Sequence, residues 1–177
     1  ISYIAQTDIR VAQDEELLEL AYQSGCNLML IGFESIDSEN LRDLNSNNWK
    51  LKQLETYTDS IRKIQEHGMI VFGSFIVGFD HDTVNIFTKI RDFVTANHIS
   101  AHFTILTALP GSRLYTQFLN EQRFSRATFW DNLSFYSLSF NHPNLSNAEA
   151  EKGIVWLYDE VYRDEVVAQR YRHMMQH

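Results

Sequence analysis

The stretch Ile70-Val71-Phe72-Gly73-Ser74-Phe75-Ile76-Val77-Gly78-Phe79-Asp80 indicates the fold of this chain. It reads as a buried apolar strand that stops at a small or polar cluster before an amphipathic helix. Two other stretches, residues 28–35 and 102–111, have the same form. In sheets built from parallel strands, ligands bind at the carboxyl ends of the strands. We therefore predict one site face where the three stretches end, with the candidate lining residues Glu34, Ser35, Ser74, Asp80 and Thr107.

The first two helices are indicated by their caps and by the spacing of their apolar residues. Asp14 is a good N-cap for a helix that ends at Gly25, where glycine provides a left-handed stop. Its apolar positions are Leu17, Leu18, Leu20 and Ala21. A second helix is predicted over residues 54–67, just before Gly68 and the central strand.

A third helix is predicted over residues 83–96, with Val84 among its inward side chains. Asn97 is expected to form its left-handed cap, and the fourth strand is expected to begin near Ser100. With a first strand in residues 3–9, these elements make four strand–helix units. The predicted fold class is α/β, with about four parallel strands, outer helices and a C-terminal helical extension.

The last third of the chain has a different pattern. Residues 110–119 predict a turn and a short helix, whereas residues 124–145 are aromatic and irregular. The alternation within residues 135–140 fits either a strand or a packed arm. Ser146 and Glu149 form a capping box for one long amphipathic helix with an acidic start and a basic end. We place a boundary after residue 122, with residues 123–177 as an aromatic arm and a long helix packed on residues 1–122.

Composition excludes several classes of protein. A formal net charge of -8 without a basic stretch argues against binding to nucleic acid or to an anionic membrane surface. No apolar run reaches the roughly 18 residues of a membrane span. The single cysteine, Cys26, precludes an internal disulfide, is interpreted as a small buried residue, and fits a cytoplasmic protein. Because Ile1 opens directly into a strand, we expect a piece of a larger protein whose exposed edge strand lets copies self-associate.

Four motifs in register carry a family resemblance. They are Gln6-Thr7-Asp8, Gly25-Cys26 before residues 31–35, His67-Gly68 before residues 75–80, and Leu109-Pro110-Gly111-Ser112-Arg113-Leu114-Tyr115. Over residues 3–120 they resemble the second half of the radical S-adenosylmethionine enzymes, closest to the cobalamin-associated branch with its methyltransferase-like and oxidative-cyclase-like members. The resemblance implies that the α/β fold is a partial TIM-like (βα) barrel, and that residues 1–122 are the C-terminal half of this catalytic barrel.

The same resemblance implies cofactors. The intact parent would use S-adenosylmethionine and a 4Fe-4S cluster, with cobalamin in some members, to act on a small-molecule substrate. Members of the family hold the cluster through a CxxxCxxC loop. One cysteine cannot supply three thiolates. We therefore expect the intact parent to be an enzyme and this chain alone to be inactive.

Cofactor contacts, but no catalytic residue, follow from the resemblance. The implied contacts are Gln6, Glu34, Ser35, Ser74, Ile76, Gly78, Thr107, Ala108 and Leu109. A carboxylate such as Glu34 can accept hydrogen bonds from ribose hydroxyls and an ammonium group. Ser74 replaces the first glycine of the family's GxIxGxxE pattern, and His81 stands at its acidic position with Asp82 one residue later. Backbone groups around residues 107–109 correspond to the segment that hydrogen-bonds adenine.

Two alternatives stay open at this point. Glu34 with Asp80, His81 and Asp82 would suit a TIM-like metal-dependent hydrolase or lyase, because carboxylates and imidazoles bind several divalent ions. A turn rich in Asp and His is also typical of a helix-capping loop, so the pattern does not require a metal. The second alternative is a non-enzymatic interaction module that keeps the fold.

Overall fold

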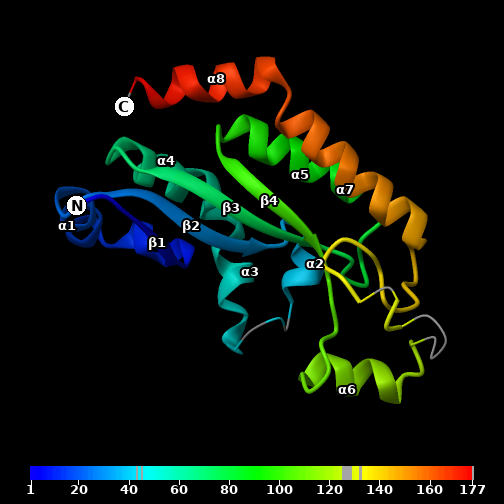
Figure 1. Cartoon of the computed structure of the whole chain (residues 1–177). Helices are drawn as coiled ribbons and strands as arrows, with labels where there is room; N and C mark the ends of the chain where they lie inside the picture. Colours follow the sequence, from blue (N-terminus) through cyan, green and yellow to red (C-terminus); the bar gives the residue numbers. More distant parts are fainter. Residues whose placement is uncertain (43, 45, 125–128, 132, 177) are drawn as a thin grey trace.

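A computed structural model of the chain describes residues 1–42, 44, 46–124, 129–131 and 133–176. Four parallel strands form one sheet in chain order (Figure 1). They are β1 (Tyr3–Thr7), β2 (Cys26–Glu34), β3 (Ile70–Val77) and β4 (Ser100–Ile105). The α/β class with a partial-barrel arrangement of four parallel strands and surrounding helices is confirmed.

Short and long helices connect the strands. The described elements are η1 (Ile9–Gln13), α1 (Glu15–Gln23), α2 (Ser38–Leu41), η2 (Ser46–Asn48), α3 (Trp49–Gln53), η3 (Leu54–Thr56), α4 (Tyr57–Glu66), α5 (Asn85–Ala96), α6 (Arg113–Asn120), α7 (Asn147–Val161) and α8 (Asp164–Met174). Figure 1 shows α2 and α6 near the carboxyl ends of the strands, and α8 at the opposite end of the sheet. No helix among the described residues is long and apolar enough to cross a membrane.

The two faces of the sheet differ. One face is covered by helices and supplies the core, where the rings of Phe33 and Phe75 stack with their centroids 5.2 Å apart. Alternate residues point to the other face and are only partly covered. This open face comprises Ile4, Gln6, Leu28, Leu30, Gly32, Ile70, Phe72, Ser74, Ile76, Ser100, His102 and Thr104, which the strand register aligns in rows. Because side chains alternate along a strand, the apolar sequence builds both a core and this second surface.

The two edges of the sheet also differ. Along the outer edge of β4, the Tyr162 hydroxyl accepts from the Ala101 N–H at 3.1 Å and donates to the Ala101 carbonyl at 2.6 Å. The Tyr158 hydroxyl accepts from the Phe103 N–H at 3.2 Å. Both tyrosines belong to the C-terminal segment around α7, which therefore closes this edge. No described strand pairs with the outer edge of β1.

Helix starts and stops mostly follow the sequence. The Asp14 side chain caps α1 by accepting from the Leu17 N–H at 2.9 Å, and Ser146 with Glu149 forms the predicted capping box of α7. Cys26 is buried, as predicted. The apolar residues of α1 do not all reach the core, since Leu18 is buried but Leu17 and Leu20 are about half exposed. α1 contacts β2 and η1, and these two leucines remain on its exposed side.

Two details of the third helix differ from the prediction. Val84 is not inward: α5 begins at Asn85, two residues after the predicted start, and Val84 is 51% exposed just before it. Asn97 does not take the left-handed conformation, because its φ is -91° and its side chain donates to the Phe93 carbonyl at 2.8 Å. The left-handed residue is His98, with a φ of 53°.

The predicted long C-terminal helix is two helices. α7 ends at Val161, and Arg163 is extended with φ -64° and ψ 150° before α8 begins. The buried Arg170 of α8 folds back and donates to the Val161 carbonyl at 3.0 Å, so it satisfies the end of α7. Residues 135–140 contain no strand, and their second half, residues 138–140, is packed as an arm, whereas Phe135 and Tyr136 are more than half exposed. The boundary after residue 122 stays a prediction.

Candidate functional site

Glu34 lies at the carboxyl end of β2 in a conformation that is rare for its residue type. Its φ is 66°, and the pairing of β2 with β3 shifts register at this point. Lys50 donates to Glu34 Oε1 at 2.8 Å and to the Gly32 carbonyl at 2.7 Å. Positive φ in a residue with a side chain is strained and concentrates at functional sites. The second carboxylate oxygen, Oε2, has no hydrogen-bond partner among the described residues, so it can accept from a ligand.

Ser35 and Asp82 belong to a buried network beneath the same ends of the strands. The Ser35 hydroxyl accepts from the Asp37 N–H at 3.1 Å and lies 3.5 Å from the amide nitrogen of Asn40. Asn40 donates to Asp82 Oδ1 at 2.6 Å. The Ser35 side chain is almost fully buried, so it supports the loop after β2 and its hydroxyl is not open to a ligand.

Asp82 joins the loop after β3 to this network. Its Oδ2 accepts from the N–H groups of Gly78 at 2.7 Å and Phe79 at 3.1 Å. Burial raises the pKa of Asp82 to about 6, although these N–H donors and Asn40 act in the opposite direction. Gly78 has a φ of 105°, which fits glycine at this turn. Asp82 therefore fixes the geometry of the turn.

Asp80 points away from Asp82. Its carboxylate forms a two-pronged ion pair with Arg123, with N–O distances of 2.9 and 2.7 Å. The predicted alternative of a metal centre at Asp80, His81 and Asp82 is not supported, because the two carboxylates already bind separate partners. Within the described residues, no three His, Cys, Asp or Glu side chains gather in a way that could hold a metal ion.

The segment after β4 lies against the aromatic arm. The Thr107 hydroxyl is 2.8 Å from the carbonyl oxygen of Ser134 and 2.9 Å from that of Ile105. Ala108 is fully buried, whereas Leu109 is about half exposed. Their side chains therefore differ in access, and Leu109 is the one that a ligand can reach.

A cleft of about 390 Å³ lies beside these loops, at the carboxyl ends of β3 and β4. It combines apolar and polar lining, from Asn40, Phe79, Asp80, Leu106, Leu114 and Phe118 among others. We call the cleft together with Glu34, Lys50 and the three loops the carboxyl-end rim. The structure thus brings Glu34, Gly78 and residues 107–109 to one end of the sheet, as predicted.

Three predicted residues lie on the open face and not at the rim itself. Gln6 is exposed on β1, and Ile76 and Ser74 are partly exposed on β3. Ser74 faces a residue that the sequence did not single out, since its hydroxyl oxygen is 2.8 Å from Nε2 of His102. The sequence could have indicated His102 by its position. It lies two residues after the strand start at Ser100 and two before Thr104, so the three side chains share one face of the sheet. Lys50 was also missed, because it lies in a helix without a recognisable motif.

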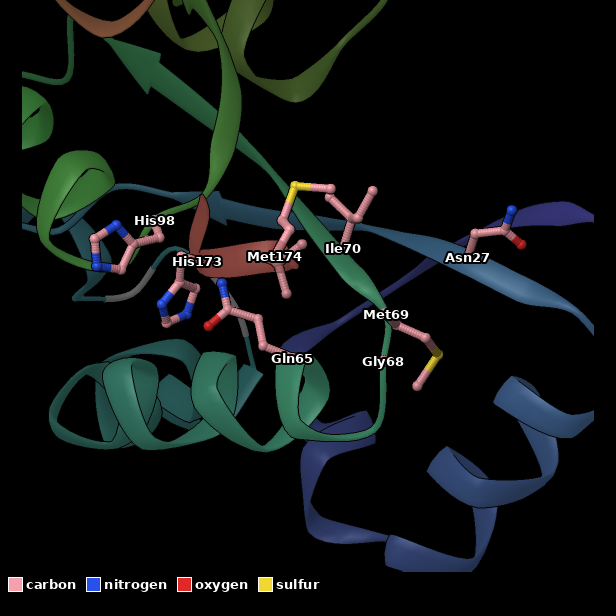
Figure 2. A pocket seen from close by; sticks show the side chains of 9 residues that line it. Asn27, Gln65, Gly68, Met69, Ile70, His98, His173 and Met174 are labelled. Atoms are coloured by element: carbon pink, nitrogen blue, oxygen red, sulfur yellow. The ribbon is translucent and has the colours of Figure 1, made fainter. Parts of the chain in front are cut away.

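A smaller cavity of about 160 Å³ lies at the opposite, amino-terminal end of the strands. Figure 2 shows His98, His173 and Met174 on one side of it and Asn27 on the other. The rings of His98 and His173 stack with centroids 4.2 Å apart. At the end of α4, Nδ1 of His67 lies 2.8 Å from the Lys63 carbonyl oxygen. His177, four residues after His173, lies outside the described residues.

No protein-family model matches the sequence. Over 96% of its length, the chain is 29% identical to a bacteriochlorophyllide d C-12(1)-methyltransferase of Chlorobaculum tepidum and spans 36% of that protein. It is 27% identical over 119 residues to a bacteriochlorophyllide d C-8(2)-methyltransferase of the same organism, spanning 26% of it. A protein described as an uncharacterized methyltransferase of Synechocystis sp. is 27% identical over 123 residues, with 22% of its length matched. The chain therefore spans about a third or less of the length of these relatives.

Among solved structures, the chain resembles the radical S-adenosylmethionine methyltransferase TsrM of Kitasatospora setae, determined with cobalamin and a 4Fe-4S cluster bound. The TM-score is 0.55 with 13% sequence identity, and the match covers 96% of this chain and 36% of that one. At this identity the likeness shows the fold. The sequence relatives are named as methyltransferases, and the structural neighbour is also a methyltransferase.

Proposed function

We propose that this chain is the part of a radical S-adenosylmethionine methyltransferase that binds the adenosyl cofactor at the carboxyl-end rim. The observation that carries the proposal is Glu34, whose backbone is left-handed, whose Oε1 accepts from Lys50, and whose Oε2 has no partner among the described residues. Ligands bind at the carboxyl ends of parallel strands. The methyltransferase relatives and the fold of TsrM agree with this assignment.

Each rim residue has a task in the proposal. Glu34 accepts hydrogen bonds from the ribose hydroxyls or the ammonium group of the cofactor. Ile76 and the turn at Gly78 support the adenine, and backbone groups near Leu109 bind its edge. S-adenosylmethionine supplies an activated methyl or adenosyl group when bound. The apolar part of the cleft, which includes Leu106 and Leu114, fits an adenine ring better than an ion.

The residues of this chain do not fit a 4Fe-4S cluster. Clusters of this kind are held by several cysteine thiolates, and Cys26 is the one cysteine and is buried in the core. In the proposal, cluster and cobalamin are held by parts of the protein other than these residues. No step of the chemistry is assigned to this chain through either group.

The proposed methyl acceptor is a tetrapyrrole. Two of the relatives are bacteriochlorophyllide methyltransferases, and both match this chain over most of its length. A carbon acceptor must lie next to the cofactor, and the open face begins directly below the rim. The proposal therefore places the acceptor on that face.

Titration of the labelled chain with S-adenosylmethionine, followed by amide NMR shifts, tests the cofactor site. We expect weak, millimolar binding with shifts gathered around Glu34, Gly78 and residues 107–109. Glu34→Gln removes a charge-assisted hydrogen bond of about 1.5–3 kcal/mol, so affinity falls roughly tenfold or more. Glu16→Gln, an exposed change on α1, leaves affinity unchanged. Shifts that gather elsewhere, or no shifts at saturating cofactor, refute the proposed site.

A further inference from the structure

His142 lies between the turn after β3 and the segment 140–145, which leads into α7. Its Nδ1 is 3.0 Å from the backbone nitrogen of Asn144 and 2.9 Å from that of Leu145. Its Nε2 is 2.8 Å from the carbonyl oxygen of Phe79. Because a backbone N–H can only donate, Nδ1 accepts both hydrogen bonds and carries no proton. A carbonyl oxygen can only accept, so the single proton of the ring is on Nε2.

Only the neutral ring fits these partners. An imidazolium carries a proton on both nitrogens and has no acceptor. A proton on Nδ1 would leave the N–H groups of Asn144 and Leu145 without their acceptor and would point a third N–H at them. The geometry around His142 therefore excludes the charged ring as long as segment 140–145 stays in place.

The electrostatic surroundings favour the same form. Burial lowers the pKa of His142 from its ordinary value of 6.5, against the opposing effects of the Phe79 carbonyl and the Asp80 carboxylate. Arg123, which is paired with Asp80, lowers this pKa further. The other titratable groups of the packed elements are engaged elsewhere or exposed: Asp82 accepts within the turn, Glu149 caps α7, and His81 is exposed to solvent.

Other contacts join the same segment to the turn. The Asn144 side chain donates to the Asp80 carbonyl at 2.8 Å. Arg123 pairs with the Asp80 carboxylate, and its own carbonyl accepts from the Asn141 N–H at 2.8 Å. Of the side chains at this junction, histidine is the type that ordinarily changes its charge between pH 5 and 8. His142 is therefore the contact through which pH acts on the junction.

The junction borders the cleft of the carboxyl-end rim. Phe79 and Asp80 line the cleft, as does Phe118, whose ring centroid is 4.0 Å from the guanidinium carbon of Arg123. If segment 140–145 leaves the turn, this wall of the cleft loses its outer support. Asp82 holds the turn from within by contacts that do not involve the segment, so the turn itself keeps its form.

We propose that His142 is an acid-sensitive latch, which holds segment 140–145 on the turn after β3 at neutral pH and releases it when the ring takes up a proton. The latched form binds this proton less readily than the released form, so a lower pH favours release. Latching is at full strength above about pH 6.5, the ordinary pKa of histidine, and weakens as the pH falls below it. The inference concerns contacts within this chain and does not depend on the ligand of the cleft.

NMR of the 177-residue chain labelled with ¹⁵N tests the latch. At pH 7.5 the ring nitrogens of His142 should show the tautomer with the proton on Nε2. Hydrogen exchange, corrected for the intrinsic rate at each pH, reports on the N–H groups of Asn144 and Leu145. From pH 7 to pH 5 their protection should fall about fivefold or more relative to that of the Gly78 N–H, which Asp82 holds.

Two matched substitutions show whether the effect belongs to His142. His142→Asn keeps an acceptor near the position of Nδ1, because an asparagine oxygen can accept from the N–H groups two and three residues later, and it has no group that titrates in this range. The fall in protection between pH 7 and pH 5 should disappear. His81→Asn makes the same change at the exposed histidine of the turn and should leave the fall as it is in the wild type.

Several results would overturn the latch. They are a proton on Nδ1 at pH 7.5, equal protection at the two pH values, and a fall that persists in His142→Asn or disappears in His81→Asn. An equal loss of protection at Gly78 would mean that acid unfolds the chain as a whole, and it also overturns the inference. If His142→Asn does not fold, the tautomer and the protection ratio of the wild type decide.

Discussion

Replacing Asp82 with alanine tests the connection between the loops that form the rim. The Asp82 carboxylate is 2% exposed and accepts from the N–H groups of Gly78 and Phe79 and from the side chain of Asn40. Alanine leaves three donors without their acceptor in a buried place. Each buried unsatisfied donor costs about 1–3 kcal/mol, and water can satisfy some of them in the space that is vacated. We expect Asp82→Ala to lower the free energy of unfolding by about 2–4 kcal/mol near neutral pH.

The pH dependence of this loss provides a second, more specific measurement. Burial raises the pKa of Asp82 from 3.8 to about 6, so the folded chain takes up this proton more readily than the unfolded chain. The contribution of Asp82 to stability therefore increases as pH falls through 6 toward 4. Between about pH 7 and pH 5 the increase is about 1.4 kcal/mol. The alanine variant lacks this contribution, so the gap between wild type and variant widens at the lower pH.

Urea unfolding followed by circular dichroism at the two pH values measures both effects. Asp80→Ala is the matched control, because it removes a carboxylate from the same turn that is about half exposed and paired with Arg123. An ion pair with a carboxylate this exposed contributes about 1 kcal/mol, so Asp80→Ala should cost less stability than Asp82→Ala. A constant gap for Asp82→Ala would show that the fold does not favour the protonated carboxyl, and a narrower gap at the lower pH would show that the fold prefers the ionised form. That result refutes the burial argument.

Three further changes probe the framework of the site. Tyr162→Phe leaves the N–H and carbonyl of Ala101 without their partner on the β4 edge, and should lower the unfolding free energy by about 1–2 kcal/mol in urea denaturation. Gly153→Ala should lower the melting temperature, because a Cβ there would collide with the ring of Phe87 where α7 packs on α5, and overpacking costs about 1–3 kcal/mol. Ile4→Lys on the open edge of β1 should abolish the predicted self-association, which sedimentation velocity measures against the wild type.

The order of strands and helices could be predicted because each signal is local. Asp14 and Ser146 mark helix starts through short side chains that accept from nearby N–H groups, and Gly68 marks a stop through its positive φ of 80°. Apolar runs of six to nine residues between these marks leave few alternatives to buried parallel strands. Long-range information was needed elsewhere. The break after Val161 depends on Arg170, which reaches back nine residues and is not visible in the helical spacing.

The site could be predicted in part for the same reason. Because Glu34 ends a predicted strand, the sequence alone placed it at the rim. Its ion pair with Lys50 could not be predicted, because an irregular connection separates the two residues in the chain. Ser35 lies at the predicted strand end, but its side chain is buried and its hydroxyl accepts a hydrogen bond from the loop that follows. His102 required the register of β3 and β4 before its contact with Ser74 could be seen.

The two edges of the sheet differ in whether a further strand could pair with them and add residues to the site. The β4 edge is satisfied by hydroxyls of Tyr158 and Tyr162 and, at Ile105, by the carbonyl of Phe135 at 2.7 Å, so it presents few free groups to another strand. The β1 edge presents its groups to solvent beside exposed apolar side chains such as Ile4. A strand that paired with β1 would lengthen the open face and place its own carboxyl end next to the rim. Any partner that contributes residues to the cofactor or acceptor site by strand pairing therefore approaches from β1, the strand that carries the exposed Gln6.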